Sequence, residues 1–177
     1  NSGRLLTLIN DIIKLSELDS REELVSLETV ELSSLTKRCV DSLQVNAGKN
    51  DVNLSFDGEM CKICANVDMM EELIINLCDN AIRYNNKNGS VLVRVRKQGE
   101  SVVLSVKDNG IGIPKEHQER IFERFYRVDK SRSKETGGTG LGLAIVKHIV
   151  ALHDAKIEVE SEVGKGSEIS VIFPRVI

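Results

Sequence analysis

Two asparagines, Asn76 and Asn80, stand four residues apart in a stretch with the apolar spacing of a helix. That spacing puts both carboxamides on one helix face, one turn apart, with Arg83 and Tyr84 just beyond them. An amide oxygen is a hard ligand that can complete the octahedral shell of a magnesium ion already bound to phosphates. Asparagines late in a helix can also be simply solvated or cap its end, so both interpretations stay open for this pair.

A second candidate is the segment DNGIGIP at 108–114, which directly follows a predicted strand. The Asp108 carboxylate can accept a hydrogen bond from an exocyclic amine, and Gly110 and Gly112 let the backbone approach a flat ring. Asp-Asn-Gly is also ordinary turn chemistry, so a plain turn is the alternative. The repeated glycine makes the plain turn the less natural interpretation.

A third candidate is the glycine-rich segment GGTGLGL at 137–143, which runs into a predicted helix. Free backbone N–H groups at a helix N-terminus bind anions, and the helix dipole adds to the attraction. Residues 115–134 hold seven Lys or Arg against four acids in a chain of net charge -3. A basic loop hinged by glycines is typical of a lid over phosphates, and a solvated charged loop is the alternative.

Composition excludes several classes of protein. The 177 residues are 41% hydrophobic and 29% charged, which indicates a folded domain rather than a disordered chain. A pI near 5.7 argues against bulk nucleic-acid binding. No apolar run approaches the roughly 20 residues of a membrane span, so we expect a soluble chain. Because it begins at Asn1, we expect a fragment of a longer protein whose other parts could include membrane spans.

The cysteines do not indicate a metal or redox site. Cys61 and Cys64 have the C-x-x-C spacing, but no second pair exists, and the histidines lie far along the chain. Zinc needs four ligands at workable spacing, so we expect reduced, mostly buried thiols. The sequence also lacks the GxxxxGK[ST] phosphate loop, so a nucleotide must be held in another way.

The first elements combine helix and strand patterns. Residues 4–18 carry an apolar stripe too broad for a lone solvated helix, so this helix needs a partner. A polar linker follows at 19–23, and residues 25–32 alternate with the period of a strand. Ser33 or Ser34 can then cap a helix that runs to about Ala47.

The rest of the chain predicts a mixed sheet covered on one face by three helices, after a separate helix from another domain. We expect strands at 52–56 and 62–65, joined by a turn at Asp57-Gly58. The remaining predicted elements are a helix at 68–84, a hairpin of strands 91–95 and 102–106, an irregular segment at 107–142, a helix at 141–152, and strands at 156–162 and 168–173.

Four segments in this order resemble the boxes of the catalytic, ATP-binding domain of bacterial sensor histidine kinases. They are EELIINLCDNAIRY at 71–84 (asparagine box), DNGIGIP at 108–114 (first glycine box), RIFERFYRVD at 120–129 (phenylalanine box) and GGTGLGL at 137–143 (second glycine box). The terminal GKGSEISVIFP fits the same pattern, and RLLTLINDIIKLSEL at 4–18 resembles the last helix of the family's dimerisation and phosphoacceptor domain.

The resemblance implies an α/β two-layer sandwich, the Bergerat-type fold shared with gyrase, Hsp90 and MutL ATPases. In it, a mixed, mostly antiparallel sheet carries three helices on one face. It also implies a boundary: residues 1–22 would end the dimerisation helix and its linker, and residues 23–177 would form the catalytic domain. The implied ligands are ATP and Mg²⁺.

Site roles follow from the resemblance alone. Asn80 would ligate magnesium, Asn76 would lie in the phosphate region, and Asp108 would bind the adenine amine. Arg127 would reach the γ-phosphate, which makes it, with Asn76, a catalytic candidate. The other positions implied to form the site are Arg83, Tyr84, Gly110, Gly112, Ile113, Gly138, Thr139, Gly140, Leu141 and Gly142, with Phe122 and Phe125 anchoring the lid.

One position favours transfer over hydrolysis. The related ATPases carry a glutamate general base where this chain has Asn76, and an amide cannot take a proton from water. The expected acceptor is a histidine on the dimerisation domain. We do not expect His117, His148 or His153 to be the phosphoryl acceptor, so the chain should bind Mg·ATP without phosphorylating itself.

The resemblance also implies the partners. These would be the protein's own dimerisation domain and a response regulator, with no nucleic acid. The parent would be a homodimer attached to the bacterial cell membrane, with this domain in the cytoplasm. Two other functions stay open: a nucleotide-regulated interaction module without transfer, and a serine kinase of the anti-sigma type.

Overall fold

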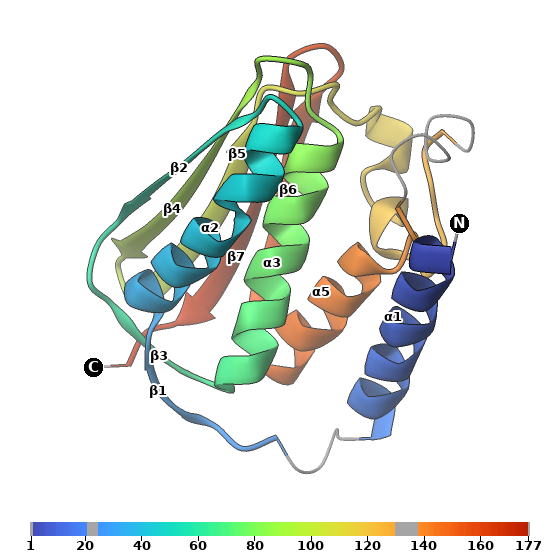
Figure 1. Cartoon of the computed structure of the whole chain (residues 1–177). Coiled ribbons are helices and arrows are strands. Elements are labelled where there is room, and N and C mark those ends of the chain that lie inside the picture. The colour runs from blue at the N-terminus through green and yellow to red at the C-terminus, as the bar shows by residue number, and fades with distance from the viewer. Residues whose placement is uncertain (1, 21–24, 130–137, 177) are drawn as a thin grey trace.

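The computed structural model describes residues 2–20, 25–129 and 138–176. Figure 1 shows helices packed against one face of a sheet. The elements in chain order are α1 (Ser2–Ser20), β1 (Glu28–Glu31), α2 (Leu32–Lys49), β2 (Asn53–Gly58), β3 (Lys62–Ala65), α3 (Val67–Arg83), β4 (Ser90–Gln98), β5 (Ser101–Asp108), the 3₁₀ turns η1 (Lys115–His117) and η2 (Arg120–Phe122), α5 (Gly142–Leu152), β6 (Lys156–Glu162) and β7 (Gly166–Pro174).

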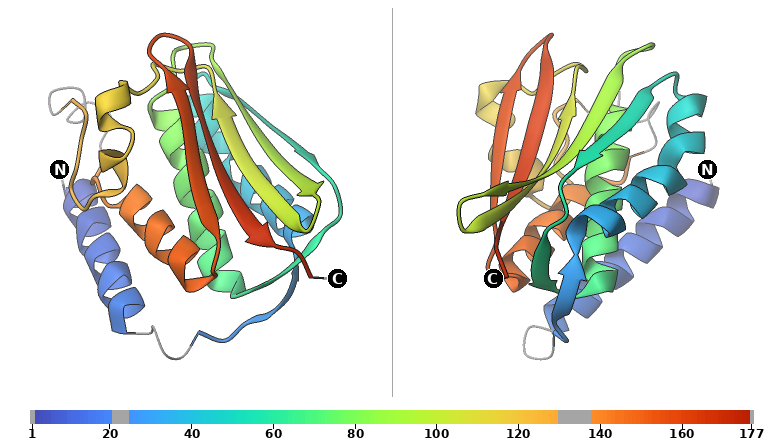
Figure 2. Two further views of the ribbon diagram at one scale, coloured as in Figure 1. Left: turned by 180° about the vertical axis from the view of Figure 1, so that it is seen from behind. Right: turned by 90° about the vertical axis from the view of Figure 1, so that its left-hand side faces the viewer.

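The main sheet has five strands in the order β2-β4-β5-β7-β6. β2 runs parallel to β4, and every other neighbouring pair is antiparallel. Helices α2, α3 and α5 cover one face of this sheet in the views of both Figure 1 and Figure 2. The predicted α/β two-layer sandwich with a mixed, mostly antiparallel sheet is therefore confirmed.

The core lies between the sheet and these helices. Alternate residues of β4, Val91, Val93 and Val95, are fully buried, whereas Arg94 between them is exposed. This period-two pattern buries one face of the sheet. The helices bury apolar residues at intervals of three and four, as Leu73 and Leu77 do in α3. Apolar burial thus fixes which faces of sheet and helices meet.

The first strand is shorter than predicted, and the predicted N-cap of the helix that follows it was wrong. The expected strand at 25–32 is confined to Glu28–Glu31, because Leu32 already begins α2. The cap is the Glu31 carboxylate, which accepts hydrogen bonds from the backbone N–H groups of Ser33 (3.2 Å) and Ser34 (2.7 Å). The same carboxylate accepts from the Cys61 N–H at 2.9 Å. This contact with a distant segment explains why a glutamate takes the position of the predicted serine.

The predicted turn at Asp57-Gly58 was also wrong. Both residues continue β2, which pairs in parallel with β4, whereas β3 pairs with β1 in a separate two-stranded sheet. Asp57 forms an ion pair with Arg96 on β4. Pairing with a strand far along the chain therefore overrides the local turn preference. In α3 the correction is smaller, because the helix begins at Val67, one residue before the expected start, and the Asn66 side chain caps it.

Helix α1 packs beside α5 (Figure 1), with Leu15 and Leu18 buried in the common core. Leu8 is partly buried against the same core. The remaining apolar side chains of the stripe are exposed, among them Leu5 and Leu6 at 59% and 60%. α5 is therefore a partner for only part of the stripe. Among the residues that the structure describes, no helix is long and apolar enough to span a membrane.

The thiols are free, and three of the four are buried. Burial raises the pKa of Cys39 to about 11 and that of Cys78 to about 12. Thiols with such raised pKa values are poor nucleophiles and poor metal ligands at neutral pH. The prediction of mostly buried cysteines is confirmed.

His153 joins the end of α5 to the start of α3. Its Nε2 accepts a hydrogen bond from the Asn66 N–H at 3.1 Å, so this nitrogen is unprotonated. Its Nδ1 can then donate to the Ile149 carbonyl at 2.7 Å. Burial lowers the pKa of His153, and the contacts with Ile149 and Asp154 offset this only in part. The folded state therefore requires the neutral ring.

We expect acid to destabilise the fold through His153. The unfolded chain titrates near the ordinary value of 6.5. Below that pH the unfolded state binds the proton more readily, so the free energy of unfolding falls until the lowered folded pKa is passed. Urea titrations at about pH 7.5 and about pH 5.5 measure this. His153→Gln, which cannot titrate, should lose about 1–3 kcal/mol at neutral pH and show a smaller pH dependence. An equal pH dependence in both proteins would contradict the assignment.

Candidate functional site

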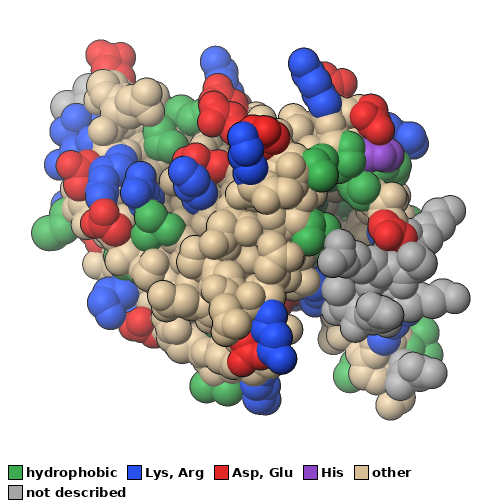
Figure 3. All heavy atoms as spheres, turned by 90° about the horizontal axis from the view of Figure 1, so that it is seen from above, with side chains coloured by type: hydrophobic (Ala, Val, Ile, Leu, Met, Phe, Trp, Pro, Cys, Tyr) green, Lys and Arg blue, Asp and Glu red, His purple; other side chains and the backbone are tan. Residues whose placement is uncertain are grey.

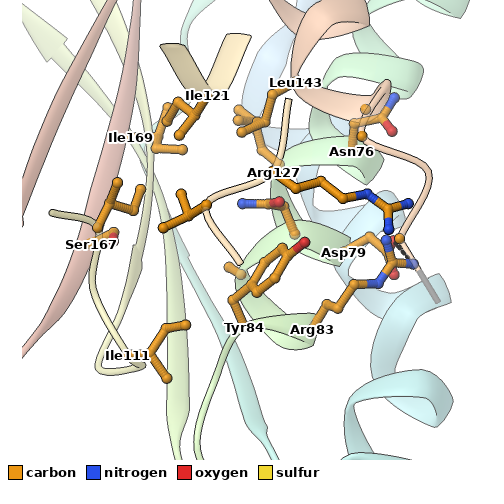
Figure 4. A pocket seen from close by; sticks show the side chains of 18 of the residues that line it. Asn76, Asp79, Arg83, Tyr84, Ile111, Ile121, Arg127, Leu143, Ser167 and Ile169 are labelled. Carbon is orange, nitrogen blue, oxygen red and sulfur yellow. Dashed lines mark ion pairs between the residues drawn. The ribbon is translucent and has the colours of Figure 1, made fainter. Parts of the chain in front are cut away.

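A pocket of about 380 Å³ lies between α3, the segment after β5 and the start of α5. Figure 4 shows its side chains converging from these elements. The sequence-predicted residues that line it are Asn76, Asn80, Arg83, Tyr84, Asp108, Gly112, Ile113, Arg127, Gly138, Thr139, Gly140 and Gly142. The fold thus brings together residues that are far apart in the sequence.

Gly110 and Leu141 are not among the lining residues. Leu141 is fully buried in the core, where it anchors the start of α5. Gly110 is buried, and a Cβ atom there would lie 2.5 Å from the Tyr84 carbonyl oxygen. Both positions shape the site through the backbone, and neither offers a contact surface of its own to the pocket.

One end of the pocket is apolar with a single carboxylate. Asp108 ends β5, and its Oδ1 accepts hydrogen bonds from the Gly110 N–H (2.9 Å) and the Ser167 N–H (3.3 Å). Burial raises the pKa of Asp108, although these two donors act in the opposite direction. Ile111 and Ile169 lie near Ser167 (Figure 4). The result is an apolar slot with one fixed acceptor.

Gly112 forms part of this wall and has no room for a side chain. Its φ is +73°, and a Cβ atom would lie 2.2 Å from the Glu162 carbonyl oxygen on β6. The segment after β5 therefore packs backbone against backbone on β6. This contact places the neighbouring Ile111 and Ile113 at the pocket.

The opposite end of the pocket holds two arginines together with Asp79, and we call it the cationic end after these arginines. Arg83 pairs with Asp79 one helical turn away at 2.9 Å, and Arg127 lies beside them (Figure 4). Burial lowers the pKa of Arg127, and repulsion from Arg4 and Arg83 adds to the effect, against attraction from Tyr84. A guanidinium group can bind a phosphate through two parallel hydrogen bonds, while Asp79 offsets part of the positive charge here.

The start of α5 adds backbone donors at the same end. The helix begins at Gly142 after Leu141, and no side chain caps it. Its first N–H groups are thus available to an anion. Asn76 faces this terminus, since a Cβ at Gly142 would lie 3.0 Å from Asn76 Oδ1. The Asn76 amide nitrogen donates to the Glu72 carbonyl at 2.9 Å, which fixes the orientation of the oxygen.

Sequence reasoning missed several lining residues. Ser167 and Ile169 come from β7 and reach the pocket only through strand pairing. Asp79 lies one residue before Asn80 and could have been found from its i,i+4 spacing to Arg83. Tyr126 precedes Arg127 and had no separate signal.

Helix α1 also contributes to the pocket, which the sequence did not indicate. Thr7 and Asp11 line it, and the Thr139 hydroxyl donates to Asp11 Oδ2 at 2.7 Å. Two ion pairs attach the same helix nearby: Lys14 with Glu72 at 2.9 Å, and Asp19 with Arg124 at 2.9 Å. The polar face of this helix therefore borders the cationic end of the site.

The expected lid is described only in part. Residues 130–137, including Gly137, lie outside the described residues. Neither Phe122 nor Phe125 is among the pocket-lining residues, and Phe125 is 57% exposed. The Phe125 N–H donates to the Gly140 carbonyl at 2.9 Å, which ties the phenylalanine segment to the second glycine segment. Seen from above in Figure 3, the surface carries Lys and Arg side chains interspersed with Asp and Glu.

A family model described as histidine kinase-, DNA gyrase B-, and HSP90-like ATPase matches residues 65–177. The chain belongs to this family. The match includes all the lining residues of the pocket apart from Thr7 and Asp11 on α1. The apolar slot with Asp108 and the cationic end with Arg127 thus lie in the ATPase domain.

Similar proteins narrow the assignment to sensor kinases. The chain is 40% identical over 174 residues to the sensor-like histidine kinase SenX3 of Mycolicibacterium smegmatis, covering 98% of this chain and 45% of that protein. It is 33% identical over 171 residues to the histidine-protein kinase ArlS of Staphylococcus aureus, covering 97% and 38%. The chain therefore contains the catalytic ATP-binding domain of a two-component histidine kinase, and spans less than half the length of these relatives.

Solved structures agree with the fold. Full-length ShkA in complex with AMPPNP superposes with a TM-score of 0.85 at 27% identity, covering 99% of this chain and 37% of that one. The mycobacterial sensor histidine kinase MprB gives a TM-score of 0.74 at 24% identity, covering 85% and 98%. The MprB likeness shows the shared fold.

We expect Gly112→Ala to destabilise the protein and to deform the pocket. Gly164→Ala is the matched control, because its φ of +83° is as unfavourable but open space surrounds it. Gly164→Ala should lower the free energy of unfolding by about 1 kcal/mol through backbone strain alone. Gly112→Ala should lower it further, because the new Cβ atom also collides with the Glu162 carbonyl oxygen. Thermal unfolding measures the difference. Equal losses in both variants would show that the close approach to β6 does not constrain the site.

Proposed function

We propose that this chain binds Mg·ATP and transfers the γ-phosphoryl group to a histidine of a dimerisation domain in two-component signalling. The observation that carries the proposal is the polarity of the pocket. An apolar slot with the half-buried Asp108 carboxylate lies at one end. At the other end lie two arginines, one of them paired with Asp79, and the start of α5, which has no side-chain cap among the described residues. A purine nucleotide has the matching polarity, with a flat ring bearing an amine at one end and phosphates at the other.

The residues fit the roles that the resemblance implies. Asp108 would accept the hydrogen bond of the adenine amine, and Tyr84 and Arg83 would line the ribose and phosphate side. Arg127 would reach the γ-phosphate. Gly138, Thr139, Gly140 and Gly142 would face the phosphates, since they border the cationic end of the pocket.

The pocket also suits a magnesium ion held jointly with the phosphates. The Asn80 amide lines the pocket and supplies the hard oxygen that Mg²⁺ prefers. The described residues hold no group of three or more acids, histidines or cysteines around a common point. Asn80 would therefore be one protein ligand among phosphate and water oxygens. A bound magnesium ion would neutralise phosphate charge.

Asn76 supports transfer over hydrolysis. Its amide nitrogen is held by the Glu72 carbonyl, so its oxygen faces the start of α5. An amide oxygen can orient a donor but cannot remove a proton from water. A bound nucleotide is then protected from hydrolysis until an imidazole, which attacks without needing a base, reaches it.

The partners follow from the relatives. Sensor histidine kinases belong to two-component systems, which contain a response regulator and a dimerisation domain. We propose that residues 1–22 end that dimerisation domain and that residues 23–177 form the catalytic domain. We further propose a homodimeric, membrane-attached parent with this domain in the cytoplasm.

We expect Asp108→Asn to weaken Mg·ATP binding by about ten- to a hundredfold, because an amide presents a donor where the amine needs an acceptor. Calorimetric titration measures the affinity of the wild-type chain and of the Asp108→Asn variant, in which Asp129 is unchanged. Guanine nucleotides serve as the control ligand, since their ring presents a carbonyl at the corresponding position. Wild-type-like affinity of the variant for ATP would remove Asp108 from the proposed role.

We expect the chain to label the phosphoacceptor domain of the full-length protein when both are mixed with Mg·[γ-³²P]ATP, and not to label itself. Phosphohistidine is labile in acid, so the label should disappear on acid treatment. An acceptor variant with glutamine in place of its histidine is the control. An acid-stable label would favour a serine kinase, and nucleotide binding without any label would favour a regulatory module.

A further inference from the structure

Tyr126 lines the pocket, and two side chains outside the pocket lining hold its ring. The Tyr126 hydroxyl forms a hydrogen bond with His117 Nδ1. The Arg120 guanidinium carbon lies 4.4 Å from the centroid of the tyrosine ring, which is a cation–π contact. The tyrosine is thus fixed both at its hydroxyl and on its face.

His117 is itself anchored to the sheet. It ends η1, and its backbone N–H donates to the Pro114 carbonyl at 2.9 Å. The next residue, Gln118, donates through its side chain to the carbonyls of Ile113 (3.0 Å) and Ser161 (3.1 Å). Because Ser161 belongs to β6, the position of His117 is set by the sheet edge rather than by a free loop.

The direction of the His117–Tyr126 hydrogen bond depends on the tautomer of His117. Glu116 Oε1 lies 3.9 Å from His117 Nε2, the ring nitrogen away from Tyr126. In the tautomer with the proton on Nε2, the Nδ1 lone pair is an acceptor. The Tyr126 hydroxyl can then donate a hydrogen bond to His117 Nδ1, which holds the tyrosine side chain in one direction.

Apolar packing does little to hold the segment that contains Tyr126. The side chains on either side of the pair Tyr126–Arg127 are largely solvent-exposed, Phe125 at 57% and Val128 at 42%. Phe125 also has a φ of +63°, a conformation that a bulky residue adopts only when its surroundings impose it. The segment therefore depends on polar contacts for its position.

We propose that His117 is a positioning residue for the phosphate end of the site. Together with Arg120 it fixes Tyr126, and the peptide bond that follows carries this constraint to Arg127, which lines the pocket next to it. The inference rests on the proposed function, in which Arg127 reaches the γ-phosphate. Loss of the His117–Tyr126 hydrogen bond would then weaken ATP binding more than ADP binding, because ADP lacks that phosphate.

Calorimetric titration of Mg·ATP and Mg·ADP into the chain tests this, with thermal unfolding to show that each variant is folded. His117→Leu should weaken ATP binding by about three- to tenfold and ADP binding by less, because it removes one hydrogen bond. His117→Asn places an amide oxygen near the position of Nδ1 and should recover most of the loss. Glu119→Gln, an exposed neighbour at the start of η2, is the matched control and should bind as the wild type does.

A double-mutant cycle isolates the tether. Tyr126→Phe removes only the hydroxyl, so it should weaken ATP binding by about as much as His117→Leu, and the double variant should lose little more. Additive losses, equal losses for ATP and ADP, or a His117→Leu variant with unchanged affinity would each overturn the inference. If the wild-type chain binds neither nucleotide, the proposed function itself fails; if it binds both and the variants match it, only the inference fails.

Discussion

The antiparallel pairing of β5 with β7 is the constraint on which the site depends. It places Asp108 opposite Ser167, whose backbone N–H then holds the carboxylate. The chain leaving β5 continues along β6, where Gly112 approaches the Glu162 carbonyl too closely for any side chain. A shift of this register by one residue would turn Asp108 to the other face of the sheet. The apolar end of the pocket therefore exists only in this register.

The cationic end rests on helix packing instead. α3 presents Asn76, Asn80 and Arg83 along one face, and α5 begins opposite them at Gly142. Because buried apolar residues pack both helices against the same sheet, Asn76, Asn80 and Arg83 keep fixed positions relative to the start of α5. Such preorganised polar groups bind a ligand without first having to be assembled.

Helix α1 contacts this end of the site. Its Asp11 accepts a hydrogen bond from Thr139, and its Asp19 pairs with Arg124, so both glycine and phenylalanine segments touch the same helix. At the same time much of its apolar stripe stays exposed. The helix thus contacts the nucleotide site through one face and leaves another for the bundle to which the resemblance assigns it.

The sequence alone determined the fold class, the helices and the identity of many polar and glycine residues of the pocket, because hydrophobic period, glycine spacing and short motifs can be read along the chain. It predicted Asn80, Asp108 and Arg127 as members of one site, but it misjudged Glu31 and the Asp57-Gly58 pair. Those errors share one cause: the Cys61 N–H and strand β4 that decide these positions lie far along the chain. Only the tertiary structure could bring Ser167 and Asp11 to the pocket, since strand register and helix docking depend on global packing.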